Sequence, residues 1–170
     1  MTTSTLPATG TYALDPERTM IRCDCKAMFG AITVHGTFRL RNGEVSIDPD
    51  RARCAVAAVI DTESYSSRNR VRDSDVRSAA LLDTRLYPEI TFTGTGVRAD
   101  GDDWVVDGSV TAHGVTQTVP VRVTEARTEG DLIRFRATAT LDRGSFGITK
   151  KKGMVGQAVT VLIDAVAVPS

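Results

Sequence analysis

Hydrophobic and polar residues alternate along much of the chain, which is the period expected of strands with one buried face. Between residues 20 and 29 the odd positions are apolar, and the even positions include arginine, aspartate and lysine. The same alternation predicts strands at residues 34–40, 89–97, 103–112, 119–127, 132–141 and 157–168. Residues 54–60 are apolar on both faces, so we expect them to form the most buried strand.

Short polar segments between these runs predict tight turns. Arg41–Glu44 contains Asn-Gly, a pair that tolerates positive φ and favours a two-residue hairpin. Asp100-Gly101 and Glu129-Gly130 carry the same kind of signal. Most strands should therefore be joined to their neighbours by short connections and run antiparallel.

One segment breaks the strand pattern. Residues 68–82 contain no Gly or Pro and predict a single short polar helix, with Ser66 or Ser67 as its cap. Pro88 marks the break before the next strand. With about eight antiparallel strands, the chain should form a sandwich or a closed barrel, and such a barrel can just hold one small ligand.

Composition fits one ordinary domain, which we assign to residues 10–170 after a flexible tail of residues 1–9. Of 170 residues 41% are hydrophobic, and 21 Lys and Arg balance 21 Asp and Glu. This balance argues against nucleic acid as the main partner. The N-terminus lacks the pattern of a secretion signal, and an odd count of three cysteines suits reduced thiols, so we expect a cytoplasmic protein.

Four segments resemble the YceI-like family in the order in which that family carries them. The longest, residues 72–92, contains R-D-x-x-x-R-S followed by Y-P-x-I-x-F. The others are GTYALDP at residues 10–16, VTAHGVT at residues 110–116 and LDRGSFGI at residues 141–148. The resemblance extends from about residue 10 to residue 168.

The resemblance implies a mainly β, lipocalin-like, extended eight-stranded antiparallel β-barrel with one short helix. It also implies non-enzymatic binding, transport or storage of a polyisoprenoid or similar long-chain amphiphilic lipid, with no cofactor. Many family members carry a secretion signal. Three departures bear on the ligand more than on the fold: Asp75 replaces a histidine, Leu81 replaces a bulky aromatic, and residues 22–26 read RCDCK.

We expect the ligand to contact inward-facing strand residues and an apolar mouth. The strand positions are Ile21, Cys23, Cys25, Ala27, Val34, Phe38, Leu40, Val56, Ala58, Ile60, Phe92, Trp104, Val106, Val110, Phe135, Ala137, Ala139, Val161 and Ile163. The mouth positions are Phe29, Leu81, Leu82, Phe146 and Ile148, with Met28 and Met154 beside them. Two alternatives stay open: the strand residues fill a solid core, and the helix end with the Phe146 loop plugs the barrel.

The sequence carries only weak signals for a catalytic or a metal-binding site. The chain has no G-x-S-x-G motif and no convincing acid–base pair, so we expect His113 to hydrogen-bond a nearby loop. His35 should point outward while Cys23 and Cys25 point inward, which argues against a metal site. An enzyme acting on a hydrophobic substrate is the weakest of the alternatives.

The remaining expectations concern partners. The ligand should be an isoprenoid or fatty lipid, and Lys150–Lys152 either contact an anionic membrane surface transiently or form a solvated turn. A homodimer is left open. The alternative function is a stress-linked protein-interaction module with a solid barrel.

Overall fold

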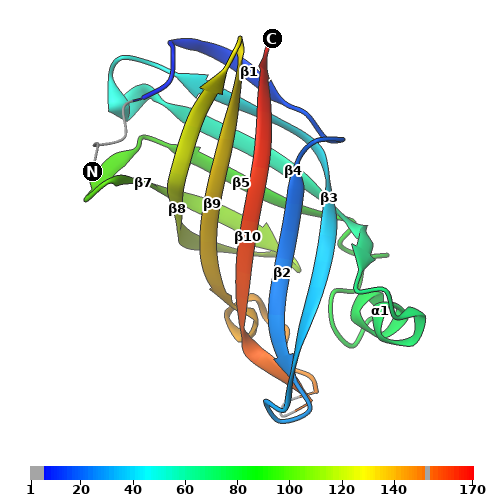
Figure 1. Cartoon of the computed structure of the whole chain (residues 1–170). Helices are drawn as coiled ribbons and strands as arrows, with labels where there is room; N and C mark the ends of the chain where they lie inside the picture. The colour runs from blue at the N-terminus through cyan, green and yellow to red at the C-terminus, as the bar shows by residue number, and fades with distance from the viewer. Residues whose placement is uncertain (1–5, 152–153) are drawn as a thin grey trace.

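Eight antiparallel strands close into a barrel (Figure 1). The computed structural model describes residues 6–151 and 154–170. Around the barrel lie β2 (Met20–Ala27), β3 (Ile32–Ile47), β4 (Ala55–Ser66), β5 (Glu89–Thr95), β7 (Asp103–Ala112), β8 (Val115–Glu129), β9 (Leu132–Asp142) and β10 (Val155–Pro169). Each strand pairs with the next in this order, and β10 pairs with β2, which closes the ring. The predicted lipocalin-like barrel is confirmed.

The short elements distinguish the two ends of the barrel. At one end, here the β1 end, lie β1 (Gly10–Leu14), β6 (Arg98–Asp100) and the 3-10 helix η1 (Arg51–Arg53). At the other, here the α1 end, lie α1 (Arg70–Arg77) and the 3-10 helix η2 (Arg143–Phe146), together with the β2–β3 turn (Figure 1). The described residues include no helix long and apolar enough to cross a membrane.

The Asn-Gly pair does not make a turn. β3 runs straight through it, so the hairpin predicted at Arg41–Glu44 is wrong. The register against β4 shifts at Arg41, the extra residue of a β-bulge. Gly43 is needed for space, because a Cβ there would lie 2.6 Å from Cδ1 of Leu14 in the antiparallel neighbour β1. The other two predicted turns, at Gly101 and Gly130, are confirmed.

The helix is shorter than the predicted range of 68–82, and its cap differs. Asn69 caps α1, with its side-chain oxygen accepting the N–H of Arg72 at 3.0 Å. Ser67 instead donates its N–H and hydroxyl to the buried Asp73 carboxylate. The chain leaves the helix after Arg77 because the following leucines turn inward to pack against the end of the barrel.

The strand predicted as the most buried is not. Within residues 54–60 only Cys54 is buried; Ala57 is exposed and Val56, Ala58 and Ile60 are half-buried. Ala57 lies on the outer face, which the described residues leave uncovered at this position. The other three face inward, so their residual exposure means that the interior beside them is not filled.

Buried side chains gather in two clusters. The first includes Tyr12, Leu14 and Ile133, has Leu6 packed against it, and extends to Tyr65 beside α1. The second, at the α1 end, contains Leu81, Val110, Ala112, Val119, Ala139, Phe146 and Ile148. Of the predicted tail at residues 1–9, residues 1–5 lie outside the described residues.

Candidate functional site

An apolar cavity of about 250 Å³ lies inside the barrel. Most of the predicted strand positions line it: Ile21, Cys23, Phe38, Leu40, Val56, Ala58, Ile60, Phe92, Trp104, Val106, Val110, Phe135, Ala137, Ala139, Val161 and Ile163. Because these positions were predicted from alternation, the alternation identified the inner face of nearly every strand. None of the described lining residues is charged.

The exposure of the lining separates a hollow barrel from a solid one. Ile60, Phe92, Phe135, Val161 and Ile163 all point inward, yet all remain only half-buried. Side chains in a filled core are covered by their neighbours on every side. The interior is therefore hollow, which weighs against the solid-barrel alternative.

The cavity is long and narrow. On β9 it is lined from Phe135 to Leu141, a span of about 20 Å at roughly 3.4 Å per residue. Its volume is slightly below the range of about 300–1,000 Å³ that is usual for ligand pockets. This shape suits one slender chain better than a bulky ring system.

Small residues keep the space open. Ala58, Ala137 and Ala139 project only a methyl group inward. At Gly108 an added Cβ would lie 2.3 Å from Cζ of Phe92, so the missing side chain lets that ring lie close against the wall. A larger residue at Gly108 would push the ring toward the cavity.

Several lining residues were not predicted. They are Leu6, Pro7, Leu14, Thr19, Val45, Ser46, Ile47, Cys54, Ala55, Ile90, Gly94, Gly96, Val97, Val119, Val121, Val123, Ala126, Leu141 and Ala165. The alternating Val119, Val121 and Val123 carried a usable signal, because that segment was already predicted as a strand. Leu6 and Pro7 lie outside any strand, and no periodicity marks them.

Four predicted residues lie toward the α1 end of β2 and β3, beyond the cavity. Cys25 and Val34 are paired across these strands, and the Cys25 thiol lies 3.4 Å from the carbonyl oxygen of Gly156. Neither they nor Ala27 line the cavity. Phe29, predicted at a mouth, is 81% exposed on the β2–β3 turn and does not line the cavity.

The other four close the α1 end. Leu81, Phe146 and Ile148 are buried together there, and Leu82 packs against them. None of the four lines the cavity. Of the two alternatives for these residues, the structure supports the plug and not the mouth.

A buried arginine holds this plug in place. Arg143 is 6% exposed, and its guanidinium donates to the carbonyl oxygens of Ile148, Val155 and Gly156 at 2.8–2.9 Å. Each of its three nitrogens donates one hydrogen bond to a backbone carbonyl oxygen, so the guanidinium ties η2 to the start of β10 without a carboxylate.

The histidine of the VTAHGVT segment contributes to the same end. Nδ1 of His113 lies 3.2 Å from the carbonyl oxygen of Phe146, to which it donates. The ring of Tyr87 packs on the imidazole with centroids 4.7 Å apart. The predicted hydrogen bond of His113 to a nearby loop is thus confirmed, and three of the four matching segments meet at the plug.

Two ionisable groups at or beside the cavity, the Cys23 thiol and the Tyr65 hydroxyl, have raised pKa values. Burial, together with the Asp24 carboxylate, raises the pKa of the Cys23 thiol to about 12. Burial and the Asp73 carboxylate raise the pKa of the nearby Tyr65 to about 12. Both groups stay protonated near neutral pH, so the thiolate needed for nucleophilic chemistry is scarce. The indole N–H of Trp104 is buried and has no hydrogen-bond partner among the described residues.

Metal ligands do not gather in the described part of the chain. No group of three His, Cys, Asp or Glu residues there could hold a metal ion. His35 points outward, as predicted, and its Nδ1 lies 2.6 Å from the Asp24 carboxylate.

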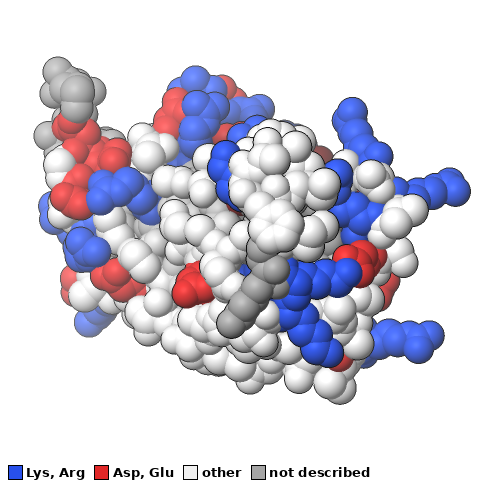
Figure 2. All heavy atoms as spheres, turned by 90° about the horizontal axis from the view of Figure 1, so that it is seen from below, with Lys and Arg blue, Asp and Glu red and all other residues white. Residues whose placement is uncertain are grey.

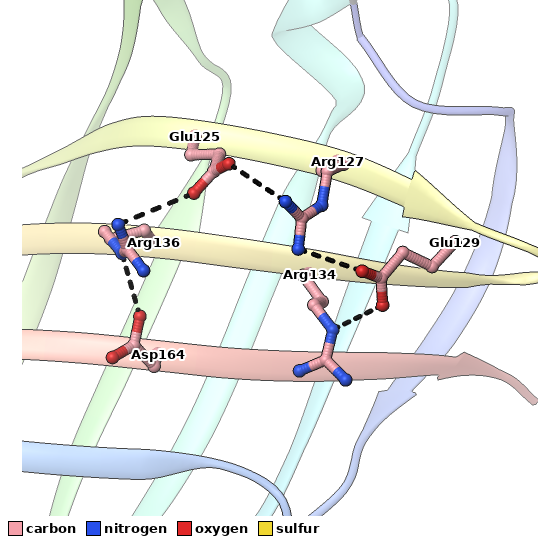
Figure 3. A network of polar contacts seen from close by, with 6 residues as sticks. All are labelled: Glu125, Arg127, Glu129, Arg134, Arg136 and Asp164. Atoms are coloured by element: carbon pink, nitrogen blue, oxygen red, sulfur yellow. Dashed lines mark hydrogen bonds and ion pairs between the residues drawn. The ribbon is translucent and has the colours of Figure 1, made fainter.

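A second hollow, of about 500 Å³, lies on the outside of the barrel over β8, β9 and β10. Figure 3 shows its lining, in which alternating Arg and Glu or Asp side chains form a chain of ion pairs. The hydrogen bond from Arg134 lowers the pKa of Glu129, and the bond to Asp164 raises that of Arg136. Its charges are already paired with one another, so this wet surface is a poor site for an apolar ligand.

Comparison with known proteins agrees with this architecture. The YceI-like domain matches residues 12–167. The chain belongs to the YceI-like family. This YceI-like chain is 33% identical to a UPF0312 protein of Pseudomonas putida over 161 residues, covering 90% of this chain and 83% of that protein. It is 31% identical to protein YceI of Escherichia coli over 137 residues, which cover 77% of this chain and 72% of that protein.

Solved structures share the fold. BcnA of Burkholderia cenocepacia superposes on this YceI-like chain with a TM-score of 0.80 at 22% identity, covering 90% of this chain and 98% of BcnA. A polyisoprenoid binding domain from Saccharophagus degradans superposes with a TM-score of 0.73 at 16% identity, covering 96% of this chain and 100% of that domain.

Proposed function

We propose that this protein binds a polyisoprenoid or similar long-chain amphiphilic lipid inside the barrel, for transport or storage and without chemical change. The observation that carries the proposal is the narrow, uncharged cavity that runs for about 20 Å along β9. The name of the Saccharophagus degradans domain, a polyisoprenoid binding domain of the same fold, supports this class of ligand.

A carrier function rather than an enzymatic one fits the lining. The cavity presents alkyl and aromatic groups, and its Cys23 thiol is held protonated by burial, with a pKa of about 12. Chemistry on a bound lipid requires a group that accepts or donates a proton near the working pH. No described lining residue is Asp, Glu, His or Lys.

Trp104 allows a direct test, because it lines the cavity and is the sole tryptophan of the chain. We expect a brominated fatty acid to quench its fluorescence saturably in delipidated protein, and farnesol to reverse the quenching by competition. Native mass spectrometry of protein purified without delipidation should show an added lipid mass.

Two neighbouring alanines provide a variant and its matched control. Ala58→Phe places a ring inside the cavity, whereas Ala57→Phe places the same ring on the exposed outer face of β4. We expect Ala58→Phe to weaken lipid binding by about tenfold or more, or about 1.4 kcal/mol, and Ala57→Phe to leave it unchanged. Equal effects of both variants, or no quenching of the parent protein, would refute binding in the cavity.

A further inference from the structure

The β2–β3 turn carries an exposed apolar cluster at the α1 end. Met28, Phe29 and Ile32 belong to the turn and its flank, and Met154 lies beside them, its carbonyl oxygen accepting the N–H of Met28 at 3.0 Å. We call these four residues the apolar tip. All are exposed, Phe29 to 81%. Soluble proteins normally bury side chains of this size, so an apolar tip that projects into water calls for an occupant.

The backbone holds the apolar tip in an unusual conformation. Met28 and Phe29 both have positive φ, 53° and 57°, a region that bulky residues rarely occupy. Two backbone hydrogen bonds close the turn, from the N–H of Gly30 to the carbonyl oxygen of Ala27 and from the N–H of Ala31 to that of Met28. The turn therefore holds two exposed bulky apolar residues in a backbone conformation that such residues rarely adopt.

Basic side chains without a carboxylate partner lie at the same end, although the Lys26 ammonium donates a hydrogen bond to the Thr33 hydroxyl at 2.9 Å. Lys26, Arg68, Arg70, Arg85 and Lys150 are exposed, and none forms an ion pair with the described acidic residues. We call these five the basic collar. Figure 2 views this end and shows Lys and Arg side chains around an uncharged protrusion, with Asp and Glu side chains among them. By contrast, the arginines of the β8–β10 wall are paired with carboxylates (Figure 3).

The loop before β10 links the two features. Lys151 forms an ion pair with Asp75 of α1 at 2.7 Å, which holds the loop carrying Lys150 against the helix that carries Arg70. Val71, also on α1, is exposed beside that arginine. Apolar and cationic groups are thus held together on one surface by contacts within the fold.

We propose that the apolar tip and the basic collar dock this protein on the surface of an anionic lipid bilayer. An anionic surface supplies the charge that the collar lacks, and the interfacial region accepts a few apolar side chains at the same time. A second copy of the chain is disfavoured, because a symmetric contact would bring two basic collars together. Nucleic acid would leave the apolar tip in water. The docking does not depend on what the cavity binds.

Flotation with lipid vesicles tests the docking. We expect the protein to float with vesicles of phosphatidylglycerol and phosphatidylcholine, to float less as salt rises, and to remain behind with pure phosphatidylcholine. Arg70→Glu should lower the vesicle partition coefficient by at least about fivefold, because losing even one cation near an anionic surface has that effect. Phe29→Ser should reduce it at least as much.

Two control variants make corresponding changes at the β1 end: one replaces an exposed apolar residue with serine and one replaces an exposed arginine with glutamate. Met20→Ser changes a methionine that is 57% exposed at the opposite end of β2, and Arg53→Glu reverses an exposed arginine of η1. Both should bind vesicles like the parent protein, and all four variants should keep its circular dichroism spectrum.

Three results would overturn the proposal: equal binding to neutral vesicles, equal loss in the control and test variants, or no vesicle binding at all. A concentration-dependent dimer that Phe29→Ser abolishes in analytical ultracentrifugation would instead assign the surface to a second copy. Lipid binding in the cavity, followed by Trp104 fluorescence, should be unaffected by Phe29→Ser, so the two proposals fail separately.

Discussion

At the scale of single residues, the absence of side-chain atoms shapes the cavity as much as their presence. Gly94 and Gly108 face each other across β5 and β7, and both are buried. Neither has a Cβ to fill the space that Phe92 and Val106 occupy. An inward face built from larger residues would have closed the interior, as happens in barrels of this size that are packed solid.

Gly108→Ala tests this role. The new methyl would lie 2.3 Å from the ring of Phe92, so the ring must swing inward. We expect a loss of about 1–3 kcal/mol in the free energy of unfolding, typical of overpacking, together with weaker quenching of Trp104 by a brominated fatty acid.

A second substitution provides the control for this prediction. Adding Phe92→Leu removes the ring that the new methyl meets, so the double variant Gly108→Ala/Phe92→Leu should recover stability relative to the sum of the single effects. Additive losses measured by urea denaturation would show that Gly108 matters for some other reason.

The sequence correctly predicted which side chains of a strand face the barrel interior. It did not predict how far along the barrel axis the cavity extends. Cys23 and Cys25 share a face, and alternation treats them alike. Yet Cys23 lines the cavity, whereas Cys25 lies beyond it, near the plug. The extent of the cavity depends on where α1 and the loops close the α1 end. That closure is made by contacts between residues far apart in the sequence, which no local pattern encodes.

At the scale of elements, bulges explain where the sequence pattern misled. Inward positions on β3 are even-numbered up to Leu40 and odd-numbered from Val45 onward, because Arg41 is an extra residue in the register with β4. The change of phase, next to an Asn-Gly pair, resembles the start of a new strand after a turn. β8 changes phase in the same way between Val123 and Ala126. A bulge and a turn leave similar traces in one sequence.

The plug at the α1 end depends on one element-level contact, the Arg143 guanidinium. Arg143→Met should leave the carbonyl oxygens of Ile148, Val155 and Gly156 without their donor while they remain poorly hydrated. We expect the free energy of unfolding to fall by about 1–3 kcal/mol or more, the cost of leaving buried carbonyl groups without a hydrogen-bond donor. Hydrogen exchange should accelerate first in η2 and at the start of β10.

The matched control for Arg143→Met is Arg136→Met. Arg136 lies on the outer wall with its side chain 65% exposed, in ion pairs with Asp164 and Glu125. Exposed pairs contribute little, so its urea midpoint should stay close to that of the parent protein. A similar loss in both variants would mean that Arg143 acts by charge alone and not by holding η2.

At the scale of the whole molecule, zero net charge conceals an uneven distribution. Arginines along the barrel wall are paired with carboxylates, and those of the basic collar are not. Composition could not reveal this, because 21 cations and 21 anions allow any arrangement. The folded chain separates three regions: a paired wall, a plugged end with exposed apolar and basic groups, and an uncharged interior.

Removing the ligand should lower the thermal stability of the barrel. A bound lipid stabilises only the folded barrel, by about 2.7 kcal/mol when its free concentration is a hundred times Kd. We therefore expect delipidated protein to melt at a lower temperature in differential scanning calorimetry and to regain the higher one when farnesol is added. Ala58→Phe fills part of the cavity with its own ring, so its melting temperature should respond little to farnesol, whereas Ala57→Phe should respond like the parent protein. A farnesol-induced rise of the same size in Ala58→Phe would place the stabilising lipid outside the barrel, because a blocked cavity leaves no room for it within.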